Sequence, residues 1–212
     1  MRVADFGRAG WQDRFARANM LPMSTVFEHP RQHVISAQEY LRMGEAGIFS
    51  PGARLELIEG EIIEMAPIGS GHAGAVNILT RLFVQVVAER AIVAVQNPVV
   101  LGLRSVPQPD LAVLRVRDDH YARAHPSAAD VLLIVEVADT TLAFDTATKA
   151  PLYARHGIPE VWVLDVQNHA ILVYRDAGAR DYRTRLRLVG DERLSALAIP
   201  GLAITPHQIF GD

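Results

Sequence analysis

Two acidic residues stand in segments of this sequence that otherwise predict buried β-strands. Asp110 introduces the predicted strand 111–116, and Glu136 interrupts the apolar run 131–137 near its end. Because an isolated ionised carboxylate costs several kcal/mol to bury, each needs a cation, a shared proton or a metal ion as its partner. Carboxylates at the ends of two adjacent strands suit a hard divalent cation bound by oxygen ligands. A structural ion pair with buried arginines is the alternative interpretation.

The third candidate is the only lysine of the chain. The sequence holds 21 basic residues, of which 20 are arginine and one is Lys149. An ammonium is a compact point charge that can contact water and a phosphate oxygen together, which a guanidinium does poorly. The single lysine therefore indicates a position where arginine will not serve. The alternatives are a solvated helix residue or an ion pair with Asp145, four residues earlier on the same predicted helix.

His72 is the fourth candidate, at the start of a predicted long helix, where the free N–H groups of the first turn favour anions. Its imidazole could bind a metal ion or contact a phosphate group. The structural alternative is that His72 holds the start of the helix to the preceding hairpin. The hairpin residues Glu56 and Glu64 could also point into the site, although most such carboxylates lie on solvated strand faces.

Turn signals and hydrophobic periodicity predict the elements that must position these residues. Ser36 and Glu39 form a capping-box pattern that opens a short helix. Apolar residues at helical spacing predict a long helix over 71–90, and a tight turn at Glu59-Gly60 predicts the hairpin. The expected strands are 55–58 and 61–65 in the hairpin, then 92–95, 99–103, 111–116, 131–137, 161–166, 170–175 and 182–189.

A second helical stretch, 140–155, directly follows the strand that carries Glu136 and contains Lys149. Pro151 lies inside this stretch, so the helix either kinks there or has its regular part begin near residue 148, with the proline in its first turn. The strand 131–137 is apolar on both faces apart from Glu136, as expected of a central strand. The order of elements predicts an α/β (α+β) fold, with a single mixed β-sheet flanked by helices.

The composition limits the class of protein. The 212 residues are 50% hydrophobic and 21% charged with a formal net charge of −3, which excludes a wholesale basic nucleic-acid binder. The chain has no cysteine, so disulfides, thiolate metal sites and cysteine nucleophiles are excluded. No apolar run is long enough to span a membrane, and the N-terminus lacks the apolar segment of a signal peptide. We therefore expect a cytoplasmic protein with no membrane partner.

The candidate residues resemble the motif of the PD-(D/E)xK nuclease superfamily. The match consists of Pro109-Asp110 followed by Glu136 at the end of an apolar strand. The surroundings are similar to the Uma-type family of restriction endonucleases within that superfamily. The matching landmarks are the opening hairpin 55–67, His72, Asp145, Lys149, Tyr153, Gly157, the segment 158–162 and Asp165. The resemblance covers roughly residues 35–205.

This resemblance implies a restriction-endonuclease-like core and a Mg²⁺-dependent endonuclease that hydrolyses phosphodiester bonds of DNA, with Mn²⁺ as a substitute metal. It implies that Asp110 and Glu136 hold the metal, with help from the backbone carbonyl of Val137. Lys149 would orient the attacking water or stabilise the charge that develops at the phosphate. His72 is the second catalytic candidate, and a homodimer is expected by analogy with nucleases that cut both strands.

The sequence departs from the usual motif in one respect that matters for the site. The standard lysine stands two residues after the glutamate, where this chain has Ala138, so the resemblance implies that the lysine has moved to the helix as Lys149. Residues 1–34 lie outside the resemblance and show no sustained periodicity. We expect them to form a leader or arm, and residues 35–212 to form the nuclease domain.

Two other functions stay open. The chain could be a nuclease-fold domain with weak or no activity that serves nucleic-acid binding or assembly, or a phosphodiesterase acting on RNA or small nucleotides. Buried Asp110, Glu136 and Lys149 favour an enzyme, because a pure binding domain has no need of buried charges. The resemblance to nucleases makes DNA the expected partner and substrate.

Other conspicuous residues fit structural roles at least as well as chemical ones. Arginines alternate along 182–189 and so share one strand face, which could track a phosphate backbone or protect an edge strand. Glu160 and Asp165 are expected to be structural. Trp162 and Tyr153 are expected in the core rather than as stacking platforms for bases.

Overall fold

The computed structural model describes residues 32–211 of the chain. The helices are α1 (Ala37–Glu45), α2 (Ser70–Val87), α3 (Leu142–Phe144), α4 (Ala150–Arg155) and α5 (Pro206–Phe210). The strands are β1 (Leu55–Ile58), β2 (Glu61–Glu64), β3 (Ile92–Val95), β4 (Leu111–Leu114), β5 (Val131–Ala138), β6 (Glu160–Asp165), β7 (Ala170–Ala177), β8 (Tyr182–Val189), β9 (Leu194–Ser195) and β10 (Ala203–Ile204). Short 3₁₀ turns lie at Ala88–Arg90 and Ala128–Asp130, and a π-helical turn lies at Asp145–Lys149.

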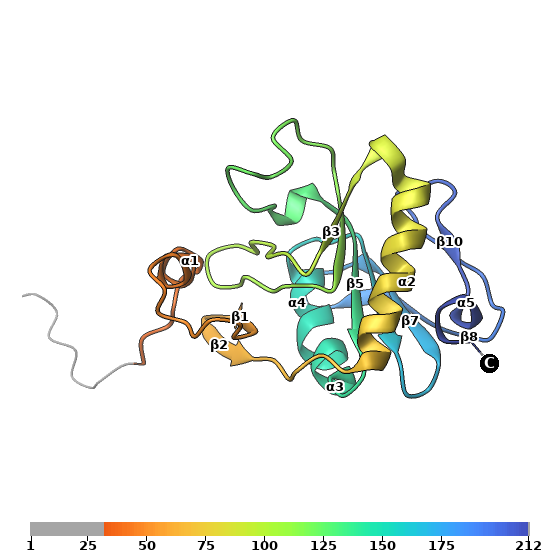
Figure 1. The fold of residues 1–212 in the computed structure, drawn as a ribbon, viewed down its shortest axis with the longest axis horizontal. Coiled ribbons are helices and arrows are strands. Elements are labelled where there is room, and N and C mark those ends of the chain that lie inside the picture. Colours follow the sequence, from red (N-terminus) through yellow and green to blue (C-terminus); the bar gives the residue numbers. More distant parts are fainter. Residues whose placement is uncertain (1–31, 212) are drawn as a thin grey trace, which may run out of the picture. The chain divides into compact units, whose positions relative to one another are not determined.

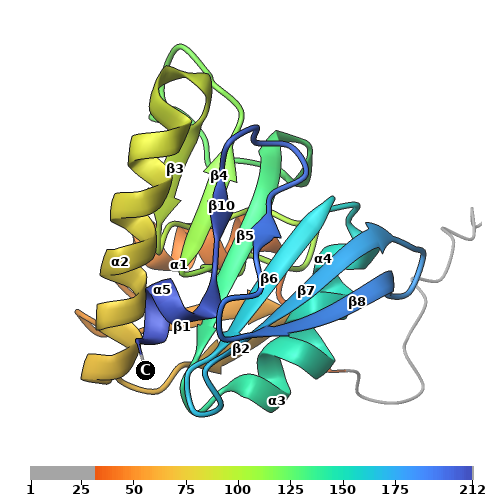
Figure 2. The same ribbon diagram turned by 90° about the vertical axis from the view of Figure 1, so that its right-hand side faces the viewer.

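Six strands form the central sheet (Figure 1), and their order, β3-β4-β5-β6-β7-β8, can be followed in Figure 2. Within this sheet β5 and β6 are parallel, and the other neighbouring strands are antiparallel. A parallel pair needs a crossover connection, which the helical segment from α3 to α4 supplies. The predicted α/β fold with a single mixed sheet flanked by helices is therefore confirmed, and the strand that carries Glu136 lies inside the sheet.

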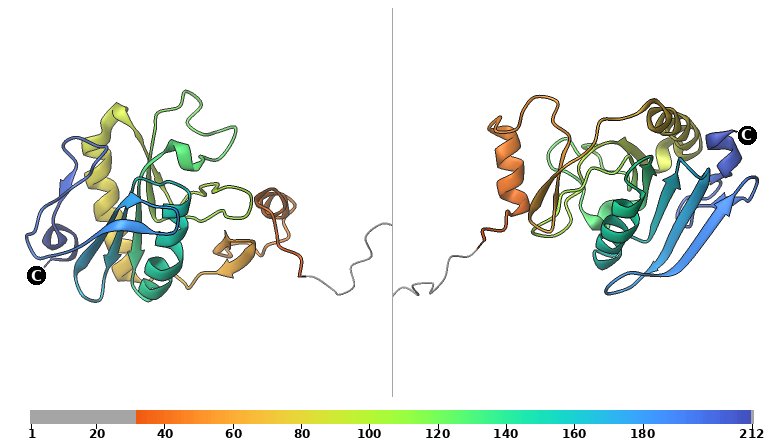
Figure 3. Two further views of the ribbon diagram at one scale, coloured as in Figure 1. Left: turned by 180° about the vertical axis from the view of Figure 1, so that it is seen from behind. Right: turned by 90° about the horizontal axis from the view of Figure 1, so that it is seen from below.

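Other elements cover both faces of this sheet, as Figure 2 and the right-hand view of Figure 3 show. One face carries Leu133 and Trp162 and packs against α2, together with residues of β9, β10 and α5. Phe83 of α2 meets Trp162 edge to face, with ring centroids 5.8 Å apart. The opposite face carries Ile134 and packs against α4. Because side chains alternate along a strand, Glu136 projects with Ile134 toward α4.

The hairpin of β1 and β2 forms as predicted and is a separate two-stranded sheet. Its turn, Glu59-Gly60, has φ values of 51° and 91°, as a type I′ turn requires. Only glycine fits the second position, since a Cβ there would lie 2.0 Å from a methyl carbon of Val34. Leu57 exchanges two backbone hydrogen bonds of 3.3 and 2.7 Å with Val106. These bonds dock the hairpin on the loop that leads to Asp110.

The crossover helix changes its winding between α3 and α4. In the π-helical turn the Ala150 N–H donates to the carbonyl of Asp145, five residues earlier. Pro151 then falls in the first turn of α4, where the N–H that proline lacks is not needed. Of the two predictions for this proline, the one that places it in the first turn of a regular helix is confirmed. Lys149 is the last residue of the π-helical turn.

Some predicted elements differ from the structure. The segment 99–103 is not a strand, because Leu101 bridges to Ser105 across a tight turn and the chain folds back on itself. The strand predicted over 111–116 ends at Leu114, where the pairing with β5 shifts register. The sequence analysis does not predict β9, β10 or α5, since elements of two to five residues are too short to show a period.

The predicted leader, residues 1–34, lies almost wholly outside the described residues, so the division of the chain near residue 35 stays a prediction. From Val34 onward the described chain forms one compact unit. None of the helices within residues 32–211 is long and apolar enough to cross a membrane.

Candidate active site

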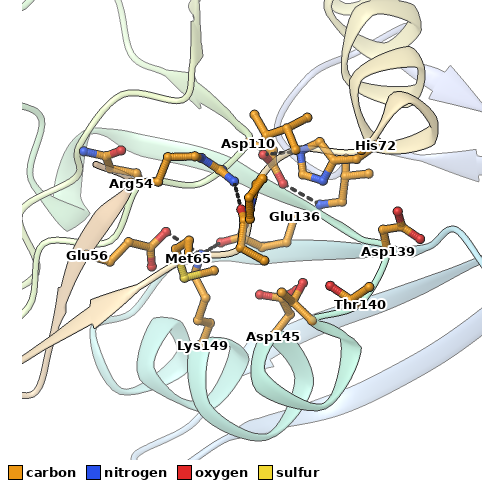
Figure 4. Close-up of a pocket in the computed structure, with 17 residues that line it drawn as sticks. Arg54, Glu56, Met65, His72, Asp110, Glu136, Asp139, Thr140, Asp145 and Lys149 are labelled. Atoms are coloured by element: carbon orange, nitrogen blue, oxygen red, sulfur yellow. Dashed lines mark hydrogen bonds and ion pairs between the residues drawn. The ribbon is translucent and has the colours of Figure 1, made fainter. Parts of the chain in front are cut away.

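Asp110 and Glu136 lie where the central strands β4 and β5 meet. The antiparallel pairing of Leu111 with Val135 sets Asp110 across from Glu136, on the same face of the sheet. Both residues are buried, with 5% and 3% of their surfaces exposed. His72 reaches Asp110 from the first turn of α2, and Lys149 reaches Glu136 from the π-helical turn (Figure 4).

Hydrogen bonds from three residues hold the Asp110 carboxylate. Its Oδ1 lies 2.8 Å from His72 Nε2 and accepts from Gln96 Nε2 at 3.2 Å. Its Oδ2 accepts from the backbone N–H of Val137 at 2.8 Å. Burial alone would raise the pKa of Asp110, but the hydrogen bonds and the charge of His72 outweigh it and leave the pKa below its ordinary value. Asp110 is therefore held as an anion.

Lys149 lies at the centre of a buried ion cluster. Its Nζ is 2.7 Å from Glu136 Oε1 and donates to Glu56 Oε1 at 3.1 Å. The Tyr153 hydroxyl donates to the same Glu136 Oε1 at 2.5 Å. Lys149 is 1% exposed, so the alternative that it is a solvated helix residue is wrong. Within the described chain its ion-pair partners are Glu136 and Glu56 rather than Asp145.

Carboxylates outnumber the ammonium in this cluster, and this excess helps to raise the pKa values of both Glu136 and Lys149. Burial raises the pKa of Glu136 well above its usual range, and the carboxylates of Asp145, Asp110 and Glu56 add to this rise against the opposing effect of Lys149. Burial alone would lower the pKa of Lys149, but the surrounding carboxylates, Glu136 foremost, raise it above its ordinary value. Lys149 therefore stays an ammonium ion in the folded protein.

A pocket of about 130 Å³ opens onto these side chains (Figure 4). Five carboxylic acids line it, namely Glu56, Asp110, Glu136, Asp139 and Asp145. Three basic side chains face them, Lys149, Arg54 and His72, and the Arg54 guanidinium donates to the carbonyl of Ala66 at 2.7 Å. The pocket therefore carries a surplus of negative charge, which attracts cations.

Glu56 belongs to this site, although the sequence favours a solvated strand face for it. Glu56 is only 3% exposed, whereas Glu64 on the partner strand of the hairpin is exposed. The Oε2 of Glu56 is buried and has no hydrogen-bond partner in the described chain. A sequence signal was present, because Glu56 stands between Leu55 and Leu57 much as Glu136 stands between valines.

The structure brings all four sequence-predicted site residues to one pocket, whose lining includes Asp110, Glu136, Lys149 and His72. His72 pairs with Asp110 rather than with the hairpin. Tyr153 is buried, as expected of a core residue, but its hydroxyl also joins the site through Glu136. Sequence reasoning did not assign a role in the site to Gln96 or Tyr153, because nothing in their local pattern points toward a carboxylate on another element.

Glu160, at the start of β6, is a buried carboxylate of another kind. Its Oε1 accepts from Arg175 Nε and Nη2 at 2.9 and 2.7 Å and from Trp162 Nε1 at 2.8 Å. Its Oε2 accepts from the backbone N–H of Leu197 at 2.8 Å. Asp165, at the other end of β6, accepts hydrogen bonds from the turn that follows it. Both acids have the structural roles that the sequence predicts.

A mixed sheet with acidic residues at the junction of two adjacent strands, and a lysine on the helix that follows, defines a protein of the restriction-endonuclease-like class. The model of the Uma2 family, described as "Putative restriction endonuclease", matches residues 37–207. The chain belongs to this family. The resemblance on which the sequence analysis relies is therefore confirmed at the level of the family.

One solved structure that the chain resembles is described as "a putative nuclease belonging to DUF820" from Anabaena variabilis ATCC 29413. The TM-score is 0.66 and the sequence identity is 17%, over 83% of this chain and 97% of that chain. At this identity the similarity supports the fold alone. No curated protein matches the chain in sequence.

Proposed function

We propose that this protein is a metal-dependent endonuclease that hydrolyses phosphodiester bonds of DNA. One observation carries the proposal: two buried carboxylates from adjacent strands and a buried ammonium line one acidic pocket. A purely structural ion cluster would have balanced charge and no opening. Membership of the Uma2 family supports a nuclease, and the surplus of carboxylates supports a cation as the missing partner.

Asp110 and Glu136 would hold the metal, Mg²⁺ with Mn²⁺ as a substitute, and the residues present fit such an ion because hard divalent cations prefer oxygen ligands. The backbone N–H of Val137 donates to Asp110. The carbonyl of Val137 points in the same direction, since the N–H and C=O of one strand residue lie on the same edge of the strand. No group of three or more acidic or histidine side chains in residues 32–211 could hold an ion. Water and the Val137 carbonyl would therefore complete the ligand set. The bound ion would polarise the scissile phosphate and lower the pKa of the attacking water.

The protein's own residues have separate tasks in this proposal. Lys149 holds a fixed positive charge at the pocket wall, where its ammonium can donate to the attacking water or to a phosphate oxygen. His72 contacts Asp110 and fixes the orientation of that carboxylate, as partners of metal ligands commonly do. The donors around Asp110 keep it ionised and therefore ready to bind a cation.

The test uses the purified protein with plasmid DNA, single-stranded DNA and RNA, in Mg²⁺ or Mn²⁺ and again with a chelator. We expect DNA to be cut, and we expect the chelator and the Lys149→Ala substitution each to stop the cutting. Cutting that survives both treatments would contradict the proposed chemistry. Cutting of RNA alone would make the protein an RNA phosphodiesterase, and binding without cutting would leave a nucleic-acid-binding domain.

The homodimer expected by analogy is part of the same proposal, because two sites facing opposite strands would cut both strands of one duplex. Analytical ultracentrifugation of the protein with DNA and Ca²⁺ measures the oligomeric state directly. We expect a dimer mass together with linear plasmid as an early product. A monomer that only nicks the plasmid would contradict this part of the proposal.

A further inference from the structure

Lys149 is held by two carboxylates that come from different parts of the fold. Glu136 belongs to β5 of the central sheet, whereas Glu56 belongs to β1 of the separate hairpin. The Lys149 Nζ lies 2.7 Å from Glu136 Oε1 and 3.1 Å from Glu56 Oε1 (Figure 4). A single carboxylate neutralises a single ammonium, so the second carboxylate calls for an explanation.

A metal ion bound by Asp110 and Glu136 would explain the second carboxylate. The inference therefore rests on the proposed function. The carboxylates of Asp110 and Glu136 together match the charge of one divalent cation. With that cation bound, Glu136 no longer provides a counter-charge for Lys149, which is only 1% exposed. Like charges a few ångströms apart in a buried site repel each other strongly. Lys149 needs another anion if it is to stay in the pocket.

We propose that Glu56 is a positioning residue that keeps Lys149 in the pocket when Glu136 coordinates a divalent cation. Its Oε2 has no partner in the described chain, so this carboxylate has spare capacity for a second hydrogen bond from the ammonium. The backbone of its neighbour Leu57 is hydrogen-bonded to Val106, which keeps the Glu56 carboxylate in place.

The single lysine permits a direct test by NMR. Protein labelled with ¹³C only in lysine gives side-chain signals from Lys149 alone, because the chain has no other lysine. Mg²⁺ is added without nucleic acid, and its binding is followed by calorimetry. In the wild-type protein we expect the Lys149 Cε signal to keep the shift of a buried side chain at saturating Mg²⁺. In Glu56→Gln we expect it to move to the free-lysine position and to narrow when Mg²⁺ binds.

Glu59→Gln is the matched control. Glu59 lies on the same hairpin but is exposed, and it pairs with Arg155 at 2.8 Å rather than with Lys149. This variant should behave like the wild-type protein. An unchanged Lys149 signal in Glu56→Gln at saturating Mg²⁺ would overturn the proposal, and so would a signal already released before Mg²⁺ is added. Loss of Mg²⁺ binding in Glu56→Gln would make Glu56 a ligand and would also overturn it.

Cleavage assays separate this inference from the proposed function. We expect Glu56→Gln to lower kcat by ~10–100-fold with little change in KM, the scale found for residues that orient a metal site. Glu56→Asp, which keeps the charge, should restore part of the rate. If the wild-type protein cuts no nucleic acid while the Lys149 signal behaves as expected, the nuclease proposal fails and the positioning role stands.

Discussion

Glu136 and Glu160 are buried carboxylates on neighbouring strands, and their surroundings differ in kind. Glu160 is 0% exposed; its Oε1 accepts from the guanidinium of Arg175, and its Oε2 accepts from the backbone N–H of Leu197. Glu136 is 3% exposed, shares Lys149 with Glu56, and faces a pocket lined by five carboxylic acids. Donors within the protein satisfy the carboxylate of Glu160. The pocket around Glu136 keeps negative charge that a cation from solution can neutralise.

Burial alone therefore does not distinguish a carboxylate that donors within the fold satisfy from one that faces an excess of negative charge. Glu136 interrupts a strand that is otherwise apolar, and Glu160 directly precedes the apolar run 161–164, so both attract attention in the sequence. The useful criterion is whether donors and cations within the fold satisfy the carboxylate. Equivalent substitutions at Glu136 and Glu160, and at their basic partners, test this criterion.

The largest contrast is expected between Glu136→Gln and Glu160→Gln. Removing the charge of Glu136 should lower cleavage by at least ~10²–10³-fold, the scale of losing one charge-stabilising group in an active site. Thermal stability should change little, because burial and the neighbouring carboxylates raise the pKa of Glu136 and so make its charge less favourable in the folded protein than in the unfolded one. Glu160→Gln should instead cost about 2–3 kcal/mol of stability, since it weakens charged hydrogen bonds to Arg175.

Calorimetry measures the thermal stability of each variant, and single-turnover cleavage measures its activity. Equal losses of activity per folded molecule in the two variants would remove the distinction between the sites.

Exchanging lysine for arginine at position 149, and arginine for lysine at position 175, should give the next largest effect. Lys149→Arg should lose roughly 10²-fold or more in cleavage, because a guanidinium cannot take the place of a compact proton donor at the reacting groups. Arg175→Lys should keep its activity and lose about 1–2 kcal/mol of stability, since lysine cannot make the two hydrogen bonds to Glu160. Full activity in Lys149→Arg would mean that the single lysine has no chemical significance.

His72→Ala should have an intermediate effect on cleavage. The imidazole contacts Asp110 at 2.8 Å, so its loss should weaken Mg²⁺ binding or turnover by ~10–100-fold. His72→Asn, whose amide can still donate, should recover part of this loss. Mg²⁺ titration by calorimetry checks the binding, and a wild-type Kd and rate in His72→Ala would exclude the contact from the site.

The smallest effect concerns the pH dependence of stability and involves Asp145. Burial raises the pKa of Asp145 above its ordinary value, so above pH 3.8 the folded state binds its proton more tightly than the unfolded state does. Its ionisation therefore lowers stability as the pH rises through that raised pKa. Asp145→Asn should have a higher Tm than the metal-free wild-type protein at neutral pH, and this difference should vanish in acid. A lower Tm for Asp145→Asn at neutral pH would contradict the surplus of negative charge in the pocket.

Much of the site was predictable from sequence because its residues violate local patterns. Asp110 and Glu136 are acids in apolar strands, and Lys149 is alone among 20 arginines. Such departures from a local pattern can be recognised from the sequence alone. The hairpin turn, α2 and the long strands of the sheet were predictable for a related reason, since periodicity and glycine reveal them without knowledge of partners.

The partners of these residues came only from the folded chain. Glu56 and Lys149 are 93 positions apart in the sequence, and their contact depends on how the hairpin docks beside the central sheet. Tyr153 reads as an ordinary buried aromatic residue until the crossover helix brings its hydroxyl to Glu136. Local patterns indicate which face of a strand or helix is apolar, because that periodicity belongs to each element alone. Which buried groups meet, and whether their charges balance, depends on packing between distant segments, and that balance is what distinguishes Glu136 from Glu160.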